Sequence, residues 1–283
     1  MFRPVFNPDI PFACKYDGVL REGMVITVCG QVLPHSQRFH VNLHHGDDIV
    51  LQVNPRYEKS YEYVVHNTRK NGSWGSEERK YEGPFPTGKP FALQIFVTLE
   101  SYKISANGKP FSEYKHRIPF SQVDRICVSG MVEASLVDIQ HLEPHYAPVP
   151  GPFNVPYKSI INGGLKQGKT IIIQGLINLH ARRLEINLRH KTGIAFYYSC
   201  DVQKNVVVQN RYENGKWGQK TTSDQMPFET GKPFQVTICV DVNEYSVFAS
   251  GRKVHTFNHR FTELQEIDVL EISGDLLLTF VQP

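Results

Sequence analysis

The feature that most constrains the fold of this chain is that its sequence is written twice. Trp74 recurs as Trp217, at an offset of 217 − 74 = 143 residues. Residues 85–91, FPTGKPF, recur at 228–234 as FETGKPF with the same offset. Other matching pairs lie 143 to 145 residues apart: Gly30 and Gly175, Asn42–Leu43 and Asn187–Leu188, Asn67 and Asn210, His116–Arg117 and His259–Arg260, Ser129–Gly130 and Ser273–Gly274. A long, nearly constant offset indicates a duplicated domain rather than a solenoid of short repeats.

A proline-rich segment separates the two copies. Four prolines fall within the nine residues 144–152, which favours a short, stiff and extended connection. We therefore place a first domain at residues 1–146, a linker at 147–152 and a second domain at 153–283.

Each copy reads as a series of short β-strands. Phe39, Val41 and Leu43 alternate with polar residues, which is typical of a strand with one buried face. Asn107–Gly108 is a hairpin signal, and no long helical pattern is present. Many short strands in about 140 residues predict an all-β chain with one antiparallel β-sandwich in each copy.

Composition narrows the function classes. Lys and Arg number 31 against 28 Asp and Glu, and this balance gives no electrostatic case for nucleic acid as a partner. No stretch approaches the roughly 18 apolar residues of a membrane span, so membrane insertion is not expected. The five cysteines are odd in number and lack C-x-x-C spacing, which favours reduced thiols. The start of the sequence shows no signal peptide, so we expect synthesis in the cytosol.

One region of the first copy gathers residue types that suit the binding of a sugar. Three of them alternate along a β-rich run and share a face, and the loop predicted from residue 67 to residue 74 turns at Asn71–Gly72 and presents an indole. The predicted carbohydrate-binding residues are Gln52, Asn54, Arg56, Asn67, Trp74, Glu77 and Arg79.

The chemistry of a pyranose explains this choice of residues. A sugar ring has an apolar patch of C–H groups, which a flat indole covers at low cost in side-chain entropy. Galactose has a larger continuous patch than glucose because its 4-hydroxyl is axial. The hydroxyls at the rim both donate and accept, so amides and charged groups suit them. A carboxylate at Glu77 between Arg56 and Arg79 is expected to be held by charge-assisted hydrogen bonds.

These residues resemble the galectin signature H-x-N-P-R, V-x-N, W-x-x-E-x-R. The chain supplies Asn54-Pro55-Arg56, then Val65-x-Asn67, then Trp74-x-x-Glu77-x-Arg79. Because the resemblance covers both copies, the whole chain looks like a tandem-repeat galectin of a kind common in nematodes.

The resemblance implies a jelly-roll β-sandwich, similar to concanavalin, in each domain. It also implies binding of β-galactosides such as lactose and N-acetyllactosamine on glycoproteins and glycolipids, without calcium, other cofactors or catalysis. The family is made in the cytosol and exported by a non-classical route, so an extracellular location is also expected. The sequence leaves homo-oligomerisation open.

Two departures from the signature are visible. Gln52 fills the position of the family's histidine, so we expect galactoside binding with altered preference or modest weakening. In the second copy only Asn210 and Trp217 keep the pattern. The other site positions become Tyr197, Ser199, Asp201, Lys220 and Thr222. We expect the second domain to bind lactose-like sugars weakly or not at all, and to bind another glycan through Trp217 or to act as a spacer.

Further motifs have plainer interpretations. Arg38 and His40 lie on the polar side of their strand, either as an extended subsite for a longer glycan or as a solvated face. Residues 44–48, HHGDD, are more typical of a polar hairpin turn than of a metal site. Residues 163–170, GGLKQGKT, match a phosphate-loop pattern, but a β-branched run follows where that motif needs a helix.

The sequence contains no recognisable catalytic motif, and Glu77 is expected to be neutralised between arginines rather than paired with a second acid as in a glycosidase. The rival to a lectin is therefore a protein-interaction module whose sugar site is vestigial.

Overall fold

The structure is a computed structural model that describes residues 2–142 and 153–283. The chain divides into two compact units, Met1–Val149 and Pro150–Pro283. The linker predicted at residues 147–152 lies outside the described residues. In the described ranges no helix is long and apolar enough to cross a membrane. The helical elements of those ranges are two short 3-10 turns, η1 (Phe120–Gln122) and η2 (Leu264–Glu266).

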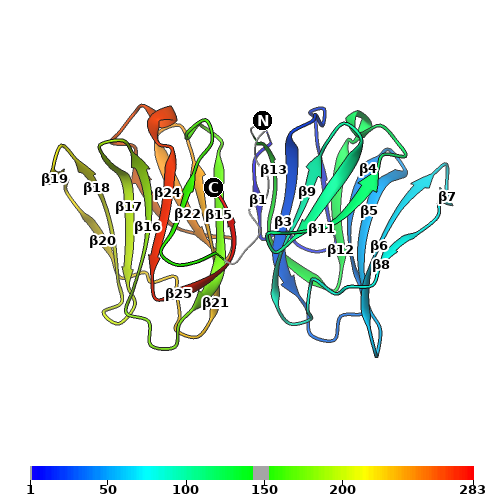
Figure 1. Ribbon diagram of the computed structural model, residues 1–283, viewed down its shortest axis with the longest axis horizontal. Helices are drawn as coiled ribbons and strands as arrows, with labels where there is room; N and C mark the ends of the chain where they lie inside the picture. The colour runs from blue at the N-terminus through cyan, green and yellow to red at the C-terminus, as the bar shows by residue number, and fades with distance from the viewer. Residues whose placement is uncertain (1, 143–152) are drawn as a thin grey trace. The chain divides into compact units, whose positions relative to one another are not determined.

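The first domain is a sandwich of two antiparallel sheets (Figure 1). One sheet has, in spatial order, β1 (Val5–Phe6), β13 (Val132–His141), β3 (Met24–Val32), β9 (Pro90–Val97), β10 (Ser101–Ala106) and β11 (Lys109–Lys115). The other has β2 (Phe12–Lys15), β12 (Arg125–Gly130), β4 (Phe39–His45), β5 (Asp48–Tyr57), β6 (Glu62–Lys70) and β7 (Ser73–Trp74), and β8 (Glu78–Lys80) also pairs with β6.

The second domain repeats this architecture (Figure 1). One sheet runs β14 (Tyr157–Ile160), β24 (Val269–Gly274), β16 (Arg183–His190), β17 (Gly193–Asp201), β18 (Val206–Glu213) and β19 (Lys216–Trp217), with β20 (Thr221–Ser223) paired to β18. The other runs β23 (Arg252–Asn258), β22 (Glu244–Ala249), β21 (Pro233–Val240), β15 (Thr170–Ile177) and β25 (Leu276–Gln282). The predicted all-β class, with an antiparallel sandwich in each domain, is confirmed.

The alternation read from the sequence places the core. Phe39, Val41 and Leu43 of β4 are fully buried, whereas the residues between them face away from the core. The aromatic ring of Phe39 packs against Phe85 and Phe91, with centroids 6.0 and 5.2 Å away. Each domain has its own apolar cluster between its two sheets. The outer face of the β4–β5–β6 sheet is therefore free to carry polar side chains.

The hairpin between β6 and β7 corrects one expectation. The sequence predicts a loop from Asn67 to Trp74, but β6 continues to Lys70 and only Asn71–Gly72 forms the turn, with both φ angles positive. The Thr68 hydroxyl donates to the backbone oxygen of Val50 at 2.9 Å, and this contact helps to keep the end of β6 in the sheet. The indole therefore stands on a paired strand rather than on a free loop.

The phosphate-loop pattern at 163–170 has no phosphate-binding geometry. It forms turns and irregular backbone, and Thr170 begins strand β15 rather than a helix. No helix N-terminus follows that could face a phosphate group.

Candidate functional site

The strands of the first domain bring the predicted site residues onto one face. Gln52 on β5 lies opposite Asn67 on β6 in the strand register. Arg79 on β8 lies opposite Val65, and Trp74 on β7 lies opposite Arg69. Residues two apart on a strand share a face. Strands β5, β6, β7 and β8 thus place these residues together on the sheet face turned away from the core.

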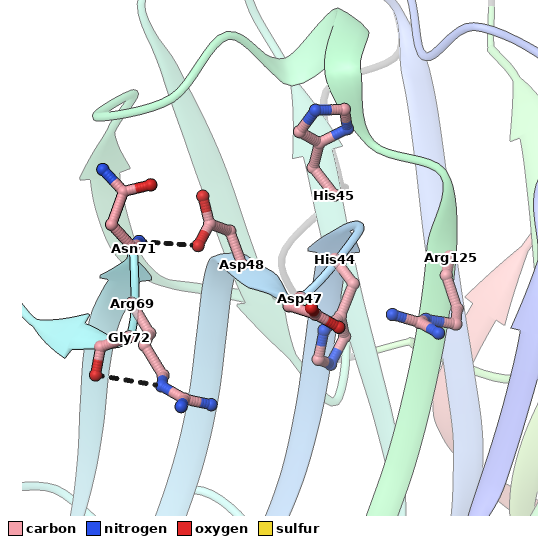
Figure 2. A pocket seen from close by; sticks show the side chains of 8 residues that line it. All are labelled: His44, His45, Asp47, Asp48, Arg69, Asn71, Gly72 and Arg125. Atoms are coloured by element: carbon pink, nitrogen blue, oxygen red, sulfur yellow. Dashed lines mark hydrogen bonds between the residues drawn. The ribbon is translucent and has the colours of Figure 1, made fainter.

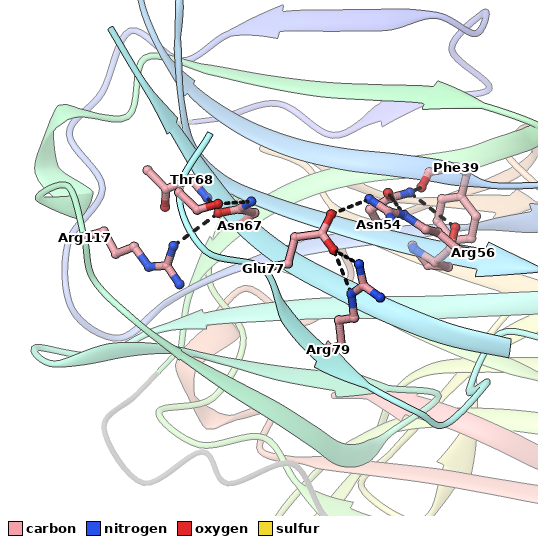
Figure 3. A network of polar contacts seen from close by, with 10 residues as sticks. Phe39, Asn54, Arg56, Asn67, Thr68, Glu77, Arg79 and Arg117 are labelled. Carbon is pink, nitrogen blue, oxygen red and sulfur yellow. Dashed lines mark hydrogen bonds and ion pairs between the residues drawn. The ribbon is translucent and has the colours of Figure 1, made fainter. Parts of the chain in front are cut away.

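Glu77 is the centre of the polar network (Figure 3). Its Oε1 accepts from Arg56 Nη2 at 3.0 Å, and its Oε2 accepts from Arg79 Nε at 2.7 Å and Nη2 at 2.6 Å. Burial opposes ionisation, but the hydrogen bonds from Arg79 and Arg56 hold the pKa of Glu77 below its usual range. The ionised carboxylate can accept a hydrogen bond from a sugar hydroxyl, and the two guanidinium groups beside it can donate one.

Asn54 lies underneath this network rather than on top of it. The side chain is 1% exposed, and its Nδ2 donates to the backbone oxygen of Phe39 at 2.7 Å. Its Oδ1 accepts from Arg56 Nε at 2.8 Å. Asn54 therefore fixes the guanidinium of Arg56, which in turn reaches Glu77.

Asn67 is held in place by a residue that the sequence prediction missed. Arg117 Nη1 donates to Asn67 Oδ1 at 3.2 Å (Figure 3). Its Nη2 donates to Glu78 Oε1 at 2.8 Å. The Asn67 amide donates to the backbone oxygen of Gly75 at 2.9 Å. A Cβ on Gly75 would lie 2.7 Å from Arg117 Nη1, so a larger residue there would push this guanidinium aside. The recurrence of His116–Arg117 in the second copy was the only sequence signal for it.

Tyr63 is a second residue that the prediction missed. Its ring is 7% exposed and lies 5.9 Å from the guanidinium carbon of Arg56 and 5.8 Å from that of Arg79. Tyr63 lies opposite Arg56 in the strand register, so the alternation from Asn67 through Val65 would have found it. The ring supports both guanidinium groups from one side.

Trp74 presents the apolar surface of the site. It is 50% exposed, whereas Gln52 and Asn67 are buried. An exposed indole next to a fixed guanidinium–carboxylate cluster offers a flat apolar plate and a row of polar partners. That combination can cover the C–H face of a sugar while bonding its hydroxyls.

Arg38 and His40 lie at the far side of this face, on or next to β4. Arg38 forms an isolated β-bridge with Arg56, which makes it a neighbour of the network. Burial and the charges of Arg38 and Arg56 lower the pKa of His40. Their role as an extended subsite remains a proposal.

A polar cavity of about 870 Å³ lies beside the site, at the tips of the β4–β5 and β6–β7 hairpins (Figure 2). Its walls carry both charge signs, and its lining residues are His44, His45, Asp47, Asp48, Arg69, Asn71, Gly72 and Arg125. Asp48 accepts from the backbone N–H of Asn71 at 2.7 Å (Figure 2), and Asp124 accepts from that of Gly46 at 2.7 Å. These bonds are those of polar hairpin turns. Across residues 2–142 and 153–283, no group of three His, Cys, Asp or Glu side chains is placed to hold a metal ion.

The sequence of each domain matches one family model, described as galactoside-binding lectin. The two matches span residues 11–139 and 156–282. The chain belongs to the galectin family. This is a family of lectins, not of enzymes.

Several galectins resemble this chain over nearly its whole length. It is 34% identical to Galectin-4 of Rattus norvegicus and 36% identical to Galectin-6 of Mus musculus, with 99% of this chain and 97% of each relative covered. It is 30% identical to a 32 kDa beta-galactoside-binding lectin of Haemonchus contortus, with 98% of this chain and 96% of that protein covered. The chain is therefore a tandem-repeat galectin.

The second galectin domain keeps two of the predicted positions in place. Asn210 lies opposite Tyr197 in the strand register, as Asn67 lies opposite Gln52, and Trp217 is 51% exposed. Asp201, at the position of Arg56, is paired with Lys204 at 3.1 Å instead. The remaining equivalents, Lys220 and Thr222, bring no carboxylate or guanidinium to the β18–β20 side.

Proposed function

We propose that this galectin binds β-galactosides of the lactose and N-acetyllactosamine type, mainly through its first domain. The observation that carries the proposal is the Glu77 carboxylate clamped between Arg56 and Arg79 next to the half-exposed indole of Trp74. These side chains are held by each other and by the sheet before any ligand arrives. Such preorganisation lowers the entropy lost on binding.

Each side chain has a role in the proposed complex. Trp74 stacks on the apolar face of galactose. The guanidinium of Arg56, fixed by Asn54, bonds the axial 4-hydroxyl region together with Gln52. Asn67 and Glu77 bond the 6-hydroxyl side.

The second sugar lies toward Arg79, which shares the Glu77 carboxylate with Arg56. None of these steps needs a metal ion or a second acid, so the site binds sugar without catalysis. The proposed galactoside site is complete without a cofactor.

Affinity for one sugar is expected to be modest. A disaccharide has about 23 heavy atoms, and roughly 0.3 kcal/mol per atom sets a ceiling near −7 kcal/mol for a shallow groove. Values of about −4 to −6 kcal/mol correspond to roughly millimolar to tens of micromolar dissociation constants. Avid attachment to glycoproteins and glycolipids then depends on multivalency, through two domains or through oligomers of the chain. Bridging of glycoconjugates follows from that arrangement.

The cellular setting belongs to the proposal as well. Free thiols suit synthesis in the reducing cytosol, and all five cysteines, Cys14, Cys29, Cys127, Cys200 and Cys239, are free. Burial raises the pKa of the Cys29 thiol, which keeps it unreactive. We propose that the chain reaches surface glycans by the non-classical route that its resemblance to galectins implies.

A galactoside column tests the lectin against the rival, an interaction module with a vestigial site. We expect the full chain to bind immobilised lactose and to elute with free lactose. Trp74→Ala and Arg56→Ala should each abolish retention, whereas the matched changes Trp217→Ala and Arg21→Ala should leave it intact. A parent chain that passes through the column unretained would support the rival.

A further inference from the structure

Three tyrosines of the first domain, Tyr61, Tyr63 and Tyr81, form a tyrosine cluster beside the polar network. The ring centroid of Tyr63 lies 5.5 Å from that of Tyr61 and 5.7 Å from that of Tyr81. The interplanar angles are 28° and 30°, so neighbouring rings lie close to parallel. Tyr63 is 7% exposed, whereas Tyr61 and Tyr81 are 52% and 66% exposed. The tyrosine cluster therefore has a buried central ring with a solvent-exposed ring on each side.

Strand pairing explains why these three rings meet. Tyr61 immediately precedes β6 and Tyr63 lies two residues further along, so their side chains share a face. Strand β8 runs antiparallel to β6, with Arg79 opposite Val65. Continuing that register places Tyr81, which follows the end of β8, opposite Tyr63. Cross-strand aromatic pairs of this kind stabilise a sheet.

Tyr63 connects the tyrosine cluster to the guanidinium groups of the site. Its ring centroid lies 5.8 Å from Arg79 Cζ and 5.9 Å from Arg56 Cζ. Hydrogen bonds to Glu77, and after it to Tyr81, raise the pKa of Arg79. Arg79 is thus bordered by one carboxylate and by two members of the tyrosine cluster.

The tyrosine cluster matters more for Arg79 than for Arg56. The side chain of Arg56 is 23% exposed, and its Nε also donates to Asn54 Oδ1 at 2.8 Å. The side chain of Arg79 is 46% exposed. A long exposed side chain loses rotamer freedom when a ligand fixes it, and neighbours that restrict it in advance reduce that loss. The tyrosine cluster is placed to restrict Arg79 in this way.

The second domain lacks the tyrosine cluster where it lacks the two arginines. At an offset of 206 − 63 = 143, the residues equivalent to Tyr61, Tyr63 and Tyr81 are Lys204, Val206 and Asp224. Val206 lies opposite Asp201 in the strand register, as Tyr63 lies opposite Arg56. The aromatic rings and the guanidinium groups therefore differ together between the two copies. Valine at this position is also compatible with the same sheet architecture.

We propose that the tyrosine cluster positions Arg79 and thereby sets how strongly the first domain prefers a disaccharide over a single galactose. Tyr63 is the positioning residue, and Tyr61 and Tyr81 brace its ring. In the complex described above Arg79 faces the second sugar, so the tyrosine cluster acts on that sugar through the guanidinium. The ligand part of this inference rests on the function proposed for the first domain, whereas the restraint on Arg79 does not.

A comparison of lactose with methyl β-galactoside reads the contribution of the second sugar. Both are titrated against a full-length Trp217→Ala chain, in which Trp74 is the sole tryptophan and its fluorescence reports binding. Tyr63→Val, which installs the residue of the second domain, should weaken lactose binding by about 2- to 5-fold, as loss of an exposed cation–π contact would give. Methyl β-galactoside should bind as it does to the parent, because Asn54 still holds Arg56.

Rescue and coupling separate positioning from a general loss of structure. Tyr63→Phe keeps the ring and should bind lactose as the parent does. In an Arg79→Ala background Tyr63→Val should cause no further loss, because the group that the ring positions is absent. Tyr16→Val is the matched control, since it removes a partly buried tyrosine next to β2, at the far edge of the same sheet. Both affinities should be unchanged in that control.

NMR relaxation of the Arg79 Nε–H group tests the restraint without any sugar. We expect a rigid group in the parent and in Tyr63→Phe, and a mobile group in Tyr63→Val. Equal mobility in the parent and Tyr63→Val would overturn the proposal, and so would lactose and methyl β-galactoside binding that weaken alike in Tyr63→Val. A parent chain with a rigid Arg79 that binds neither sugar would reject the first-domain function and the ligand part of this inference, while the restraint would stand.

Discussion

Replacing Glu77 by glutamine should separate binding from stability in the first domain. The change keeps the shape of the side chain and removes the charge between Arg56 and Arg79. The three contacts involved are 3.0, 2.7 and 2.6 Å long, and the carboxyl side chain is 30% exposed. An amide can accept from only one of the two guanidiniums through its single oxygen, so the clamp opens on one side.

Glu77→Gln is expected to change the stability of the domain less than it changes the affinity for lactose. Partly exposed ion pairs contribute about 0–1 kcal/mol each, so the free energy of unfolding should change by less than about 1 kcal/mol. A hydrogen bond from a sugar hydroxyl to a charged acceptor contributes about 1.5–3 kcal/mol. Lactose binding should therefore weaken by roughly 10- to 150-fold. A starting dissociation constant of about 0.1 mM would rise into the millimolar range.

Lactose titration followed by Trp74 fluorescence in a Trp217→Ala chain measures the binding, and thermal unfolding measures the stability. Glu82→Gln is the matched control, because Glu82 pairs with Lys80 at 3.8 Å on the exposed end of the same segment. Its affinity for lactose should equal that of the parent. Unaltered lactose binding in Glu77→Gln would refute the role given to the carboxylate, and so would a loss of affinity explained by unfolding.

Three further predictions follow from the same site. Gly75→Ala should weaken lactose binding by about 2- to 12-fold in a titration, because its Cβ displaces Arg117, and an unchanged affinity would argue against that role. Asn54→Ala should lower the free energy of unfolding by about 1–3 kcal/mol in a denaturant series, since it leaves a buried carbonyl without its donor. Retention on lactose should be constant from roughly pH 8 to 5 and fall only below the ordinary Glu pKa of about 4.3. Burial alone would raise the pKa of Glu77, but the hydrogen bonds from Arg79 and Arg56 lower it, so the carboxylate loses its charge only in more acid solution. The pKa of His40 is also lowered, so its ring stays neutral near pH 7. A step in retention near pH 6.5 would contradict this assignment.

The sequence predicted the fold well because strand alternation and turn chemistry are local. Phe39, Val41 and Leu43 are buried as their alternation requires, and Asn107–Gly108 forms the expected hairpin turn between β10 and β11. The loop expected between Asn67 and Trp74 was wrong for most of its length. A contact from Thr68 to a neighbouring strand decides that boundary, and such contacts are not visible in a local pattern.

The candidate site was predictable only where its residues lie close in sequence. The spacing from Trp74 to Arg79 put Glu77 and Arg79 on one segment, and the structure shows these two side chains as an ion pair. Arg117 comes from a segment 50 residues beyond Asn67, so only the folded chain brings them together.

A crystal structure of the full chain with lactose tests the central claim most directly. The account predicts density for a galactose ring over the indole of Trp74, with its hydroxyls within hydrogen-bond distance of Arg56, Asn67 and Glu77. Lactose bound elsewhere on the first domain, or an empty face at saturating sugar, would contradict it.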